Sequence, residues 1–199
     1  MIDIELIIFA AVAVFVLSRL YIVLGKKTGA EPPPSVIREA AKNRVSGEDN
    51  ADVSSIRPAF TGPGAAAMEE ISRMDRLFTP TDFVRKSKKA YEMIVEAFAE
   101  GDKKTLSNLL VDDVYEAYVS AIDAREESGA EPLRLMRLKS AEIADAEIID
   151  GSIGQVSVSF EAQLSDGENL RTAKEIWTFE RALKESNPAW LLAGVSEAS

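Results

Sequence analysis

The side chains available for chemistry in this sequence form a restricted set, because it contains neither cysteine nor histidine. Their absence excludes disulfides, thiolate nucleophiles, histidine acid–base catalysis and the usual zinc sites. Aspartate, glutamate, lysine, tyrosine, serine and threonine remain. No Asp is placed on an apolar face of a predicted strand opposite the tyrosines, as proton abstraction by an Asp base and a Tyr donor would require. We therefore expect a protein that is not an enzyme and that uses no metal or cofactor.

A group of aromatic side chains is the first candidate site. These residues are predicted to lie between helices and a sheet, and they are Tyr91, Tyr115, Tyr118, Phe160, Trp177 and Phe179. One interpretation is that they line a cavity for an apolar ligand. The other is that they are core residues, with the tyrosine hydroxyls reaching water, as is common for large aromatics.

A basic cluster on the early turns of a predicted helix is the second candidate site. It consists of Arg85, Lys86, Lys88 and Lys89, and with Phe83 it forms the candidate lipid- or partner-binding surface. Cations near a helix N-terminus oppose the helix dipole, so their position suggests a use other than helix stability. The cluster is either a solvated helix face or a contact for anionic lipid or an acidic partner. A juxtamembrane basic residue contributes about 1 kcal/mol near an anionic membrane surface.

Local signals predict the helix that carries this cluster. Thr79 can cap it, Pro80 takes its first position, and Asp82 completes a capping box, while Gly101 ends it. Phe78 and Phe83 occupy the positions of a hydrophobic staple. Further helices are predicted over residues 65–75, 102–110 and 113–128, the last with Asp112 as its cap.

The strand that should organise the core is Glu175 to Arg181, where Trp177, Phe179 and one edge of Arg181 share a face in the two-residue period. The pairs Asp150-Gly151 and Asp166-Gly167 predict hairpin turns. The strands are predicted over residues 133–149, 155–165, 173–183 and 190–195. Helices followed by an antiparallel meander indicate an α+β fold, with helices packed on a curved sheet.

The charge of the chain restricts its partners. The formal net charge is −10, and residues 65–199 account for all of it, with 16 basic and 26 acidic side chains. An acidic domain repels phosphate backbones, so no nucleic-acid partner is expected.

The N-terminus has the composition of a membrane anchor. Leu6 to Leu24 is apolar apart from Ser18 and Arg19, and as a helix it would be about 28 Å long, close to the thickness of the bilayer core. The anchor candidates are Leu6, Phe9, Phe15, Leu17, Arg19, Leu24, Lys26 and Lys27. The basic residues follow the apolar run, which predicts a single pass with the N-terminus outside and the C-terminus in the cytoplasm. A cleaved signal followed by a periplasmic domain is the alternative, and a buried core helix is disfavoured because such helices are rarely apolar all round.

The chain divides into three predicted parts. Residues 1–25 form the anchor, residues 26–64 form a flexible linker that contains Pro32-Pro33-Pro34, and residues 65–199 form the folded domain.

Several short blocks together carry a resemblance to a known family. They include Ala97 to Asp102, Val156 to Phe160, the Glu-Ile-Trp-Thr-Phe-Glu-Arg strand at 175–181, and Asn187-Pro188-Ala189-Trp190. Over about Gly64 to Val195 the chain resembles the Tim44-like domain, named after an adaptor subunit of the mitochondrial inner-membrane translocase. With its apolar N-terminus and Pro-rich linker, it looks like the short bacterial relatives called TimA.

The resemblance implies an α+β domain related to the nuclear-transport-factor-two-like folds, with a cavity and a membrane-associating surface. It implies an adaptor in the bacterial cytoplasmic (inner) membrane that binds a protein partner (a translocon component, a chaperone or a membrane protein) and contacts anionic phospholipid. The chain lacks the long segment through which mitochondrial members engage their chaperone, so that motor role is not carried over. The alternative function is a carrier or sensor of an apolar ligand, such as a lipid, held in the cavity.

Overall fold

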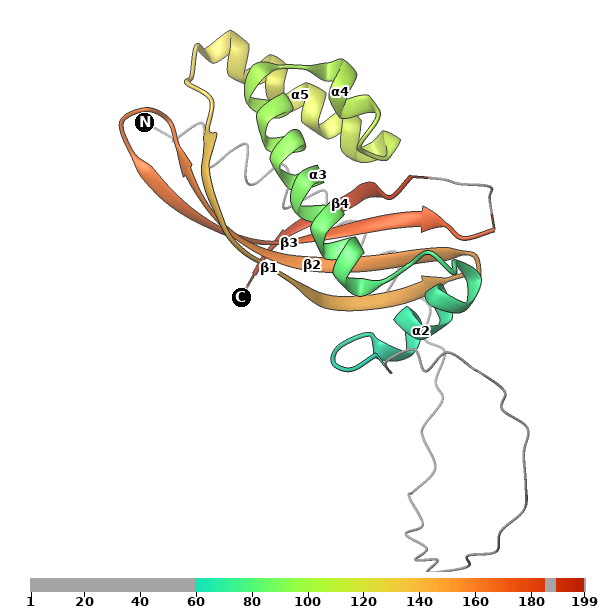
Figure 1. Ribbon diagram of the computed structural model, residues 1–199. Helices are drawn as coiled ribbons and strands as arrows, with labels where there is room; N and C mark the ends of the chain where they lie inside the picture. Colours follow the sequence, from blue (N-terminus) through green and yellow to red (C-terminus); the bar gives the residue numbers. More distant parts are fainter. Residues whose placement is uncertain (1–59, 185–188, 199) are drawn as a thin grey trace, which may run out of the picture.

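The structure is a computed structural model that describes residues 60–184 and 189–198. In this part of the chain four helices come first and four strands follow (Figure 1). The helices are α2 (Ala65–Met74), α3 (Pro80–Glu100), α4 (Lys103–Ser107) and α5 (Asp112–Ser128), and the strands are β1 (Arg134–Ile149), β2 (Ile153–Ser165), β3 (Leu170–Ala182) and β4 (Leu191–Glu197). The order of helices before strands agrees with the α+β fold predicted from the sequence.

The predicted membrane anchor lies outside the described residues. This applies to all its candidates from Leu6 to Leu24, to Lys26 and Lys27, and to the predicted linker as far as residue 59. Within the described residues, no helix combines the length and the apolar composition that crossing a membrane requires.

Helix α3 begins and ends where its local sequence predicts. The Thr79 Oγ1 accepts a hydrogen bond from the Asp82 backbone N–H at 3.2 Å, and the rings of Phe78 and Phe83 lie 5.7 Å apart as a staple. Gly101 closes the helix in the left-handed conformation, at φ 71°. One detail differs from the prediction. The Asp82 carboxylate does not complete the capping box, because it pairs with Arg85 and Lys86, one turn further along α3.

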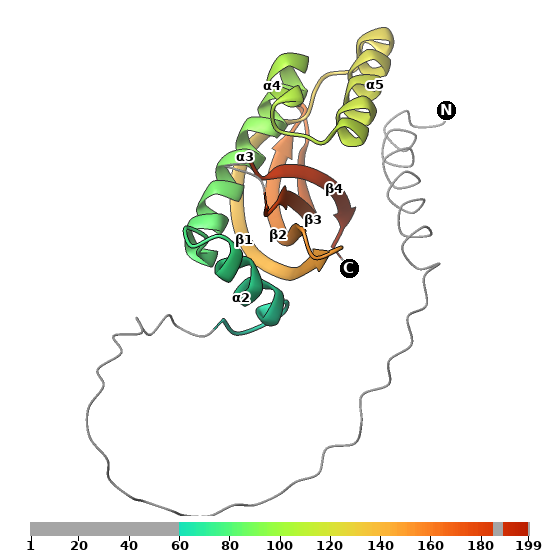
Figure 2. The same cartoon turned by 90° about the vertical axis from the view of Figure 1, so that its right-hand side faces the viewer.

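The sheet is a four-stranded antiparallel meander in the order β1-β2-β3-β4. Strands β2 and β3 pair without interruption from Ile153 and Ala182 to Ser165 and Leu170. Three register shifts interrupt the pairing of β1 with β2, and such bulges increase local bending and twist. In Figure 2 the strands curve strongly, and α3 lies along the curved sheet.

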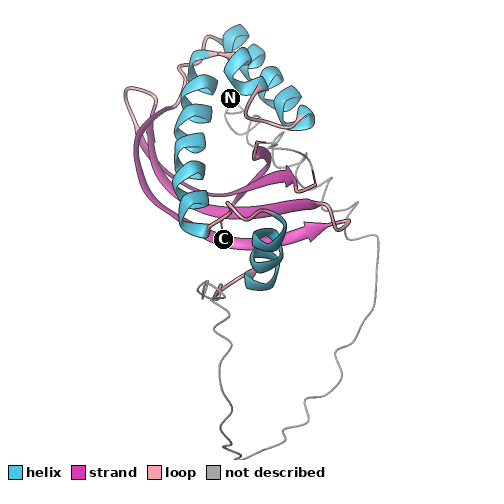
Figure 3. Ribbon diagram, turned by 45° about the vertical axis from the view of Figure 1, so that its right-hand side comes forward, coloured by secondary structure: helices cyan, strands magenta, loops and turns pink. Residues whose placement is uncertain are grey.

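Helix α3 lies across the sheet, with α2 near one of its ends and α4 and α5 near the other (Figure 3). Alternate residues of β2 turn inward and are buried, among them Val156, Val158 and Phe160. Phe83, Tyr91 and Ile94 of α3 meet them in the same core, whose members belong to one apolar cluster. Burial of these side chains is the main stabilising term of the domain.

Helices α4 and α5 are fixed at one end of the core. The Arg125 guanidinium donates to the carbonyl oxygens of Phe98 at 2.9 Å and of Ala99 at 3.2 Å, which joins α5 to the end of α3. The loop between α4 and α5 pairs with β4, because the Val111 N–H donates to the Leu192 carbonyl at 3.0 Å. Val111, and not Asp112, is the residue that precedes α5; Asp112 lies in its first turn.

Candidate functional site

The basic cluster of Arg85, Lys86, Lys88 and Lys89 lies on the exposed side of α3. Arg85 pairs with Asp82, and Lys86 Nζ lies 2.8 Å from Asp82 Oδ2. These hydrogen bonds, that of Lys86 first, hold the pKa of the Asp82 carboxyl below its usual value. Lys88 and Lys89 form no ion pair with the described residues, so the cluster keeps two uncompensated cations facing solvent.

Phe83 does not belong to this surface. Its side chain is only 4% exposed, and its ring packs edge-on against Trp190 at 4.9 Å and against Phe179 at 6.0 Å. The hydrophobic staple explains the position, because it turns the ring into the core at the start of α3. Phe83 therefore fixes the helix that carries the cluster and is not part of the predicted binding surface.

An open groove of about 560 Å³ runs beside the cluster, between the first turns of α3 and β1. It is lined by Pro80, Thr81, Val84, Arg85, Lys88, Glu142 and Ile143. Pro80, Val84 and Ile143 supply apolar atoms. Arg85 and Lys88 supply cations on the α3 side, and Glu142 supplies a carboxylate on the β1 side. The groove can therefore hold an apolar chain next to an anionic group.

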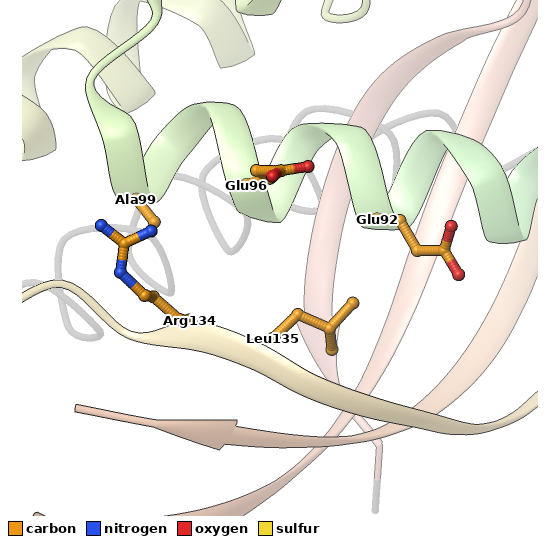
Figure 4. Close-up of a pocket in the computed structure, with 5 residues that line it drawn as sticks. All are labelled: Glu92, Glu96, Ala99, Arg134 and Leu135. Carbon is orange, nitrogen blue, oxygen red and sulfur yellow. The ribbon is translucent and has the colours of Figure 1, made fainter. Parts of the chain in front are cut away.

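A second hollow of about 330 Å³ lies between the last turns of α3 and the start of β1. Figure 4 shows Glu92 and Glu96 on α3, and Arg134 extending from β1 toward Ala99, with Leu135 beside it. Its charges are therefore the reverse of those in the groove, with carboxylates on the helix and a cation on the strand.

The predicted cavity residues pack on one another. The Tyr91 ring lies 4.6 Å from that of Phe160 and 4.5 Å from that of Trp177, and Trp177 lies 6.4 Å from Phe179. All four side chains are at most 2% exposed. Tyr115 and Tyr118 lie partly buried against the same core, with Tyr118 edge-on to Phe98 at 5.1 Å.

None of these six aromatic residues lines the groove or the second hollow. The structure places Tyr91, Phe160, Trp177 and Phe179 in the core and Tyr115 and Tyr118 at its edge. The Tyr91 hydroxyl donates to Glu175, whereas the core interpretation expected the tyrosine hydroxyls to reach water.

A glutamate contacts Tyr91, although the sequence places no Asp opposite the tyrosines. Glu175 lies on β3, and its Oε2 accepts hydrogen bonds from Trp177 Nε1 at 3.1 Å and from the Tyr91 hydroxyl at 3.4 Å. Burial raises the pKa of Glu175, and Glu197 of β4, its pairing partner, raises it further, while the two donors oppose the shift. The pKa of Tyr91 and that of Tyr118 are raised by burial and by the charge of Glu175.

Comparison with family models decides what kind of domain carries this surface. Residues 64–197 match the model of the Tim44-like domain. The chain belongs to the Tim44-like domain family. A search of curated proteins returned no significant match. Among solved structures, the intermembrane space region of the chloroplast protein ARC6 is similar at 17% identity and a TM-score of 0.43, over 58% of this chain and 97% of that one.

The sequence did not predict two polar contacts of this Tim44-like domain, that of Glu175 with its two donors and that of Arg181 with Asp75. Arg181 Nη1 donates to Asp75 Oδ2 at 2.8 Å, and Asp75 lies just after α2, 106 residues earlier in the chain. The only available signal was the two-residue period of β3, which places Glu175 and Arg181 on the same face as Trp177. No signal in the sequence identified Asp75 as the partner of Arg181.

Proposed function

We propose that this Tim44-like protein is a membrane-anchored adaptor whose domain binds a protein partner in protein translocation or membrane-protein biogenesis, and that the same domain contacts anionic lipid. Family membership supports the adaptor role. The observation that carries the lipid contact is the apolar groove with Arg85 and Lys88 on its wall and Lys89 exposed beside them.

The lipid contact uses two kinds of group in the groove. Val84 and Ile143 offer an apolar surface to an acyl chain or to the hydrocarbon boundary. Arg85 and Lys88 lie within reach of a headgroup phosphate, for which a guanidinium supplies a fork of donors and an ammonium a point charge. Each basic residue near an anionic membrane contributes about 1 kcal/mol, so the cluster attracts such a surface although the chain is acidic overall.

The anchor and topology remain those predicted from residues 1–25, with the linker over 26–64 and the domain over 65–199. We propose a single pass in the bacterial cytoplasmic (inner) membrane, with the domain in the cytoplasm. Lys26 and Lys27, which directly follow the apolar run, support this orientation. The helices packed on a curved antiparallel sheet are in keeping with a relation to the nuclear-transport-factor-two-like folds.

The alternative function, a carrier or sensor of an apolar ligand, draws less support from the structure. The aromatic residues predicted to line its cavity contact one another directly, and Tyr91 lies between Phe160 and Trp177. Glu175, the acid beside them, lines neither the groove nor the second hollow. We therefore propose action by binding and not by catalysis.

Vesicle co-sedimentation tests the lipid contact. Residues 60–199, checked first for folding by circular dichroism, are mixed at low salt with vesicles of anionic phospholipid. Changing Arg85, Lys86, Lys88 and Lys89 to Gln should reduce the bound fraction strongly, because exposed charges act through this screened attraction. A matched control changes the four exposed cations Arg76, Lys104, Arg137 and Lys174 to Gln. Equal binding by both variants and the unchanged domain would exclude the lipid role of this cluster.

Mass spectrometry of native membrane patches tests the adaptor role. We expect a protein, such as a translocon component or a chaperone, to copurify with the full chain in stoichiometric amount. A reproducible apolar ligand in the absence of any protein would favour the carrier function instead.

A topology reporter tests the proposed orientation. Lys26→Glu with Lys27→Glu removes the basic flank of the apolar run, so the reporter should change its orientation. An unaltered orientation would remove the support that the positive-inside rule gives to a cytoplasmic domain.

A further inference from the structure

The exposed face of α3 is divided by charge into two halves. Its first half carries the basic cluster, and its second half carries Glu92, Glu96 and Glu100, all exposed. Arg85, Lys89, Glu92, Glu96 and Glu100 follow one another at spacings of three or four residues, which places them in one stripe. We call this stripe, with Lys86 and Lys88 at its edge, the charge-divided face.

This arrangement of charges is unfavourable for the helix itself. Cations gather at the positive end of the helix dipole and carboxylates at its negative end. Arg85 and Lys89, Glu92 and Glu96, and Glu96 and Glu100 are like charges four residues apart, a spacing that destabilises a helix. Glu92, Glu96 and Glu100 form no ion pair with the described residues. The fold sets Glu142 of β1 beside the basic half and Arg134 of β1 beside the acidic half, but helix stability alone does not account for the pattern.

The pattern is complementary to itself. Two copies of α3 can lie antiparallel about a twofold axis between residues 90 and 91. The numbers of any two residues that then face each other add to 181. Arg85 of one copy then lies opposite Glu96 of the other, and Lys89 lies opposite Glu92. The twofold axis repeats both pairs, so four basic–acidic pairs form from the two stripes, two of them at Arg85, which also pairs with Asp82 of its own helix. A self-complementary patch of this kind is the requirement for a closed, isologous dimer.

We propose that the charge-divided face is a docking surface for a second copy of this chain, with the two α3 helices antiparallel. A second copy is the occupant that the structure favours, because the basic half of the stripe in one copy faces the acidic half in the other. The wall formed by β1 carries Glu142 beside the cations and Arg134 beside the carboxylates. These wall charges compete with an incoming copy, so it lies along the outer side of α3, away from β1.

Association through this face is weak and depends on salt. The pairs are exposed at the rim of a helix, and such ion pairs contribute little individually and are screened at high ionic strength. The basic half is shared with the proposed lipid contact, whereas the acidic half serves only the second copy. Changes in Glu92, Glu96 and Glu100 therefore separate this inference from the proposed function.

Charge reversal in the full chain, purified in a non-ionic detergent, tests the inference by sedimentation equilibrium at about 0.05 M and about 0.5 M salt. The all-basic variant carries Glu92→Lys, Glu96→Lys and Glu100→Lys. The all-acidic variant carries Arg85→Glu, Lys88→Glu and Lys89→Glu. The matched control reverses three exposed carboxylates elsewhere, with Glu116→Lys, Glu127→Lys and Glu131→Lys.

We expect the unchanged chain and the control to form dimers at low salt and to dissociate at high salt. Each of the two α3 variants alone should associate at least about tenfold more weakly, and their equimolar mixture should recover the dimer as a mixed species, as exposed opposite charges require. That recovery also shows that both variants are folded.

Monomers of the unchanged chain at low salt would overturn the inference. It would equally be overturned by dimers that persist in both α3 variants, or by a mixture that does not recover them. If a reversed variant fails to fold, Glu92→Gln with Glu96→Gln and Glu100→Gln replaces it, and undiminished association of that variant excludes the face as well.

Discussion

The inward face of β3 carries a charged side chain at each end, and the two side chains have different kinds of partner. Glu175, Trp177, Phe179 and Arg181 share this face, so two aromatic rings separate an acid from a base. At one end Arg181 has a charged partner, Asp75, at 2.8 Å. At the other end Glu175 has neutral donors, the Trp177 indole and the Tyr91 hydroxyl.

Because the partners differ, mutation and pH should affect the stability of the two ends differently. When one partner of a buried ion pair is lost, the other is left as an uncompensated charge. A carboxylate held by neutral donors can take up a proton, so its contribution to stability varies with pH. We expect the Asp75 end to respond strongly to mutation and the Glu175 end to respond mainly to pH.

The largest effect on stability is expected from Trp177, one of the two aromatic residues that lie between the two ends. Trp177→Ala should lower the free energy of unfolding by about 3–5 kcal/mol, because the indole is 2% exposed and its removal leaves a large cavity. Urea denaturation followed by circular dichroism measures the loss. Leu77→Ala, at a side chain that is 87% exposed, is the control and should change little. A loss below about 1 kcal/mol for Trp177→Ala would contradict its place in the core.

The Asp75 end should give the next largest effect. Asp75→Ala leaves the Arg181 guanidinium without its carboxylate, and since both side chains are less than one-fifth exposed we expect a loss of about 2–3 kcal/mol. The paired change Asp75→Leu with Arg181→Met should cost less than Asp75→Ala alone, because it removes both charges. Urea denaturation of the three proteins makes the comparison, and a larger loss in the double variant would show that packing, not charge, dominates there.

The Glu175 end should show its effect as a pH dependence. Burial raises the pKa of Glu175 in the folded state, so its proton stabilises the fold at low pH, and this contribution is lost as pH rises through the raised value. Glu175→Gln should therefore gain stability relative to the unchanged protein as pH rises, and this gain should disappear at low pH. Urea denaturation between about pH 4 and pH 8 measures the difference.

Glu161 supplies a control of the opposite sign. Its pKa is lowered by its hydrogen bond with Lys139, so its contribution is present above its ordinary pKa and is lost as pH falls. Glu161→Gln should therefore lose stability relative to the unchanged protein at neutral pH. If both variants followed pH in the same direction, the assignment of Glu175 as the titrating group would be wrong.

The smallest effect on stability is expected from the outer face of α3. Lys88→Gln or Glu92→Gln should each change the free energy of unfolding by less than about 0.5 kcal/mol, since both side chains are exposed and form no ion pair with the described residues. Thermal unfolding measures this. A loss above about 1 kcal/mol would mean that the charge-divided face supports the fold and is not reserved for binding.

The parts of the fold that the sequence predicted are those that depend on neighbouring residues. Thr79 and Pro80 start α3 and Gly101 ends it by local hydrogen bonding and backbone conformation. The alternation of Val156, Val158 and Phe160 likewise sets which face of β2 is buried.

Contacts between distant residues could not be predicted in the same way. The sequence led us to group Phe83 with Arg85 on one binding surface, and it gave no sign that Trp190 of the last hairpin covers the Phe83 ring. The groove depends on Ile143 of β1 lying beside Val84 of α3, and the ion pair depends on Asp75 reaching Arg181. Each of these contacts joins segments far apart in the chain, so no single stretch of sequence encodes it.

The irregular pairing of β1 has a further consequence for crowded conditions. An edge strand exposes unpaired backbone groups, and a long regular one is a template for cross-β aggregation. The shifts after Leu135, Leu138 and Ile143 leave no regular run longer than the one from Asp145 to Ile149. A neighbouring chain therefore cannot extend the sheet along the whole of β1. Many copies of the domain can therefore be held close together without seeding a fibre from this edge.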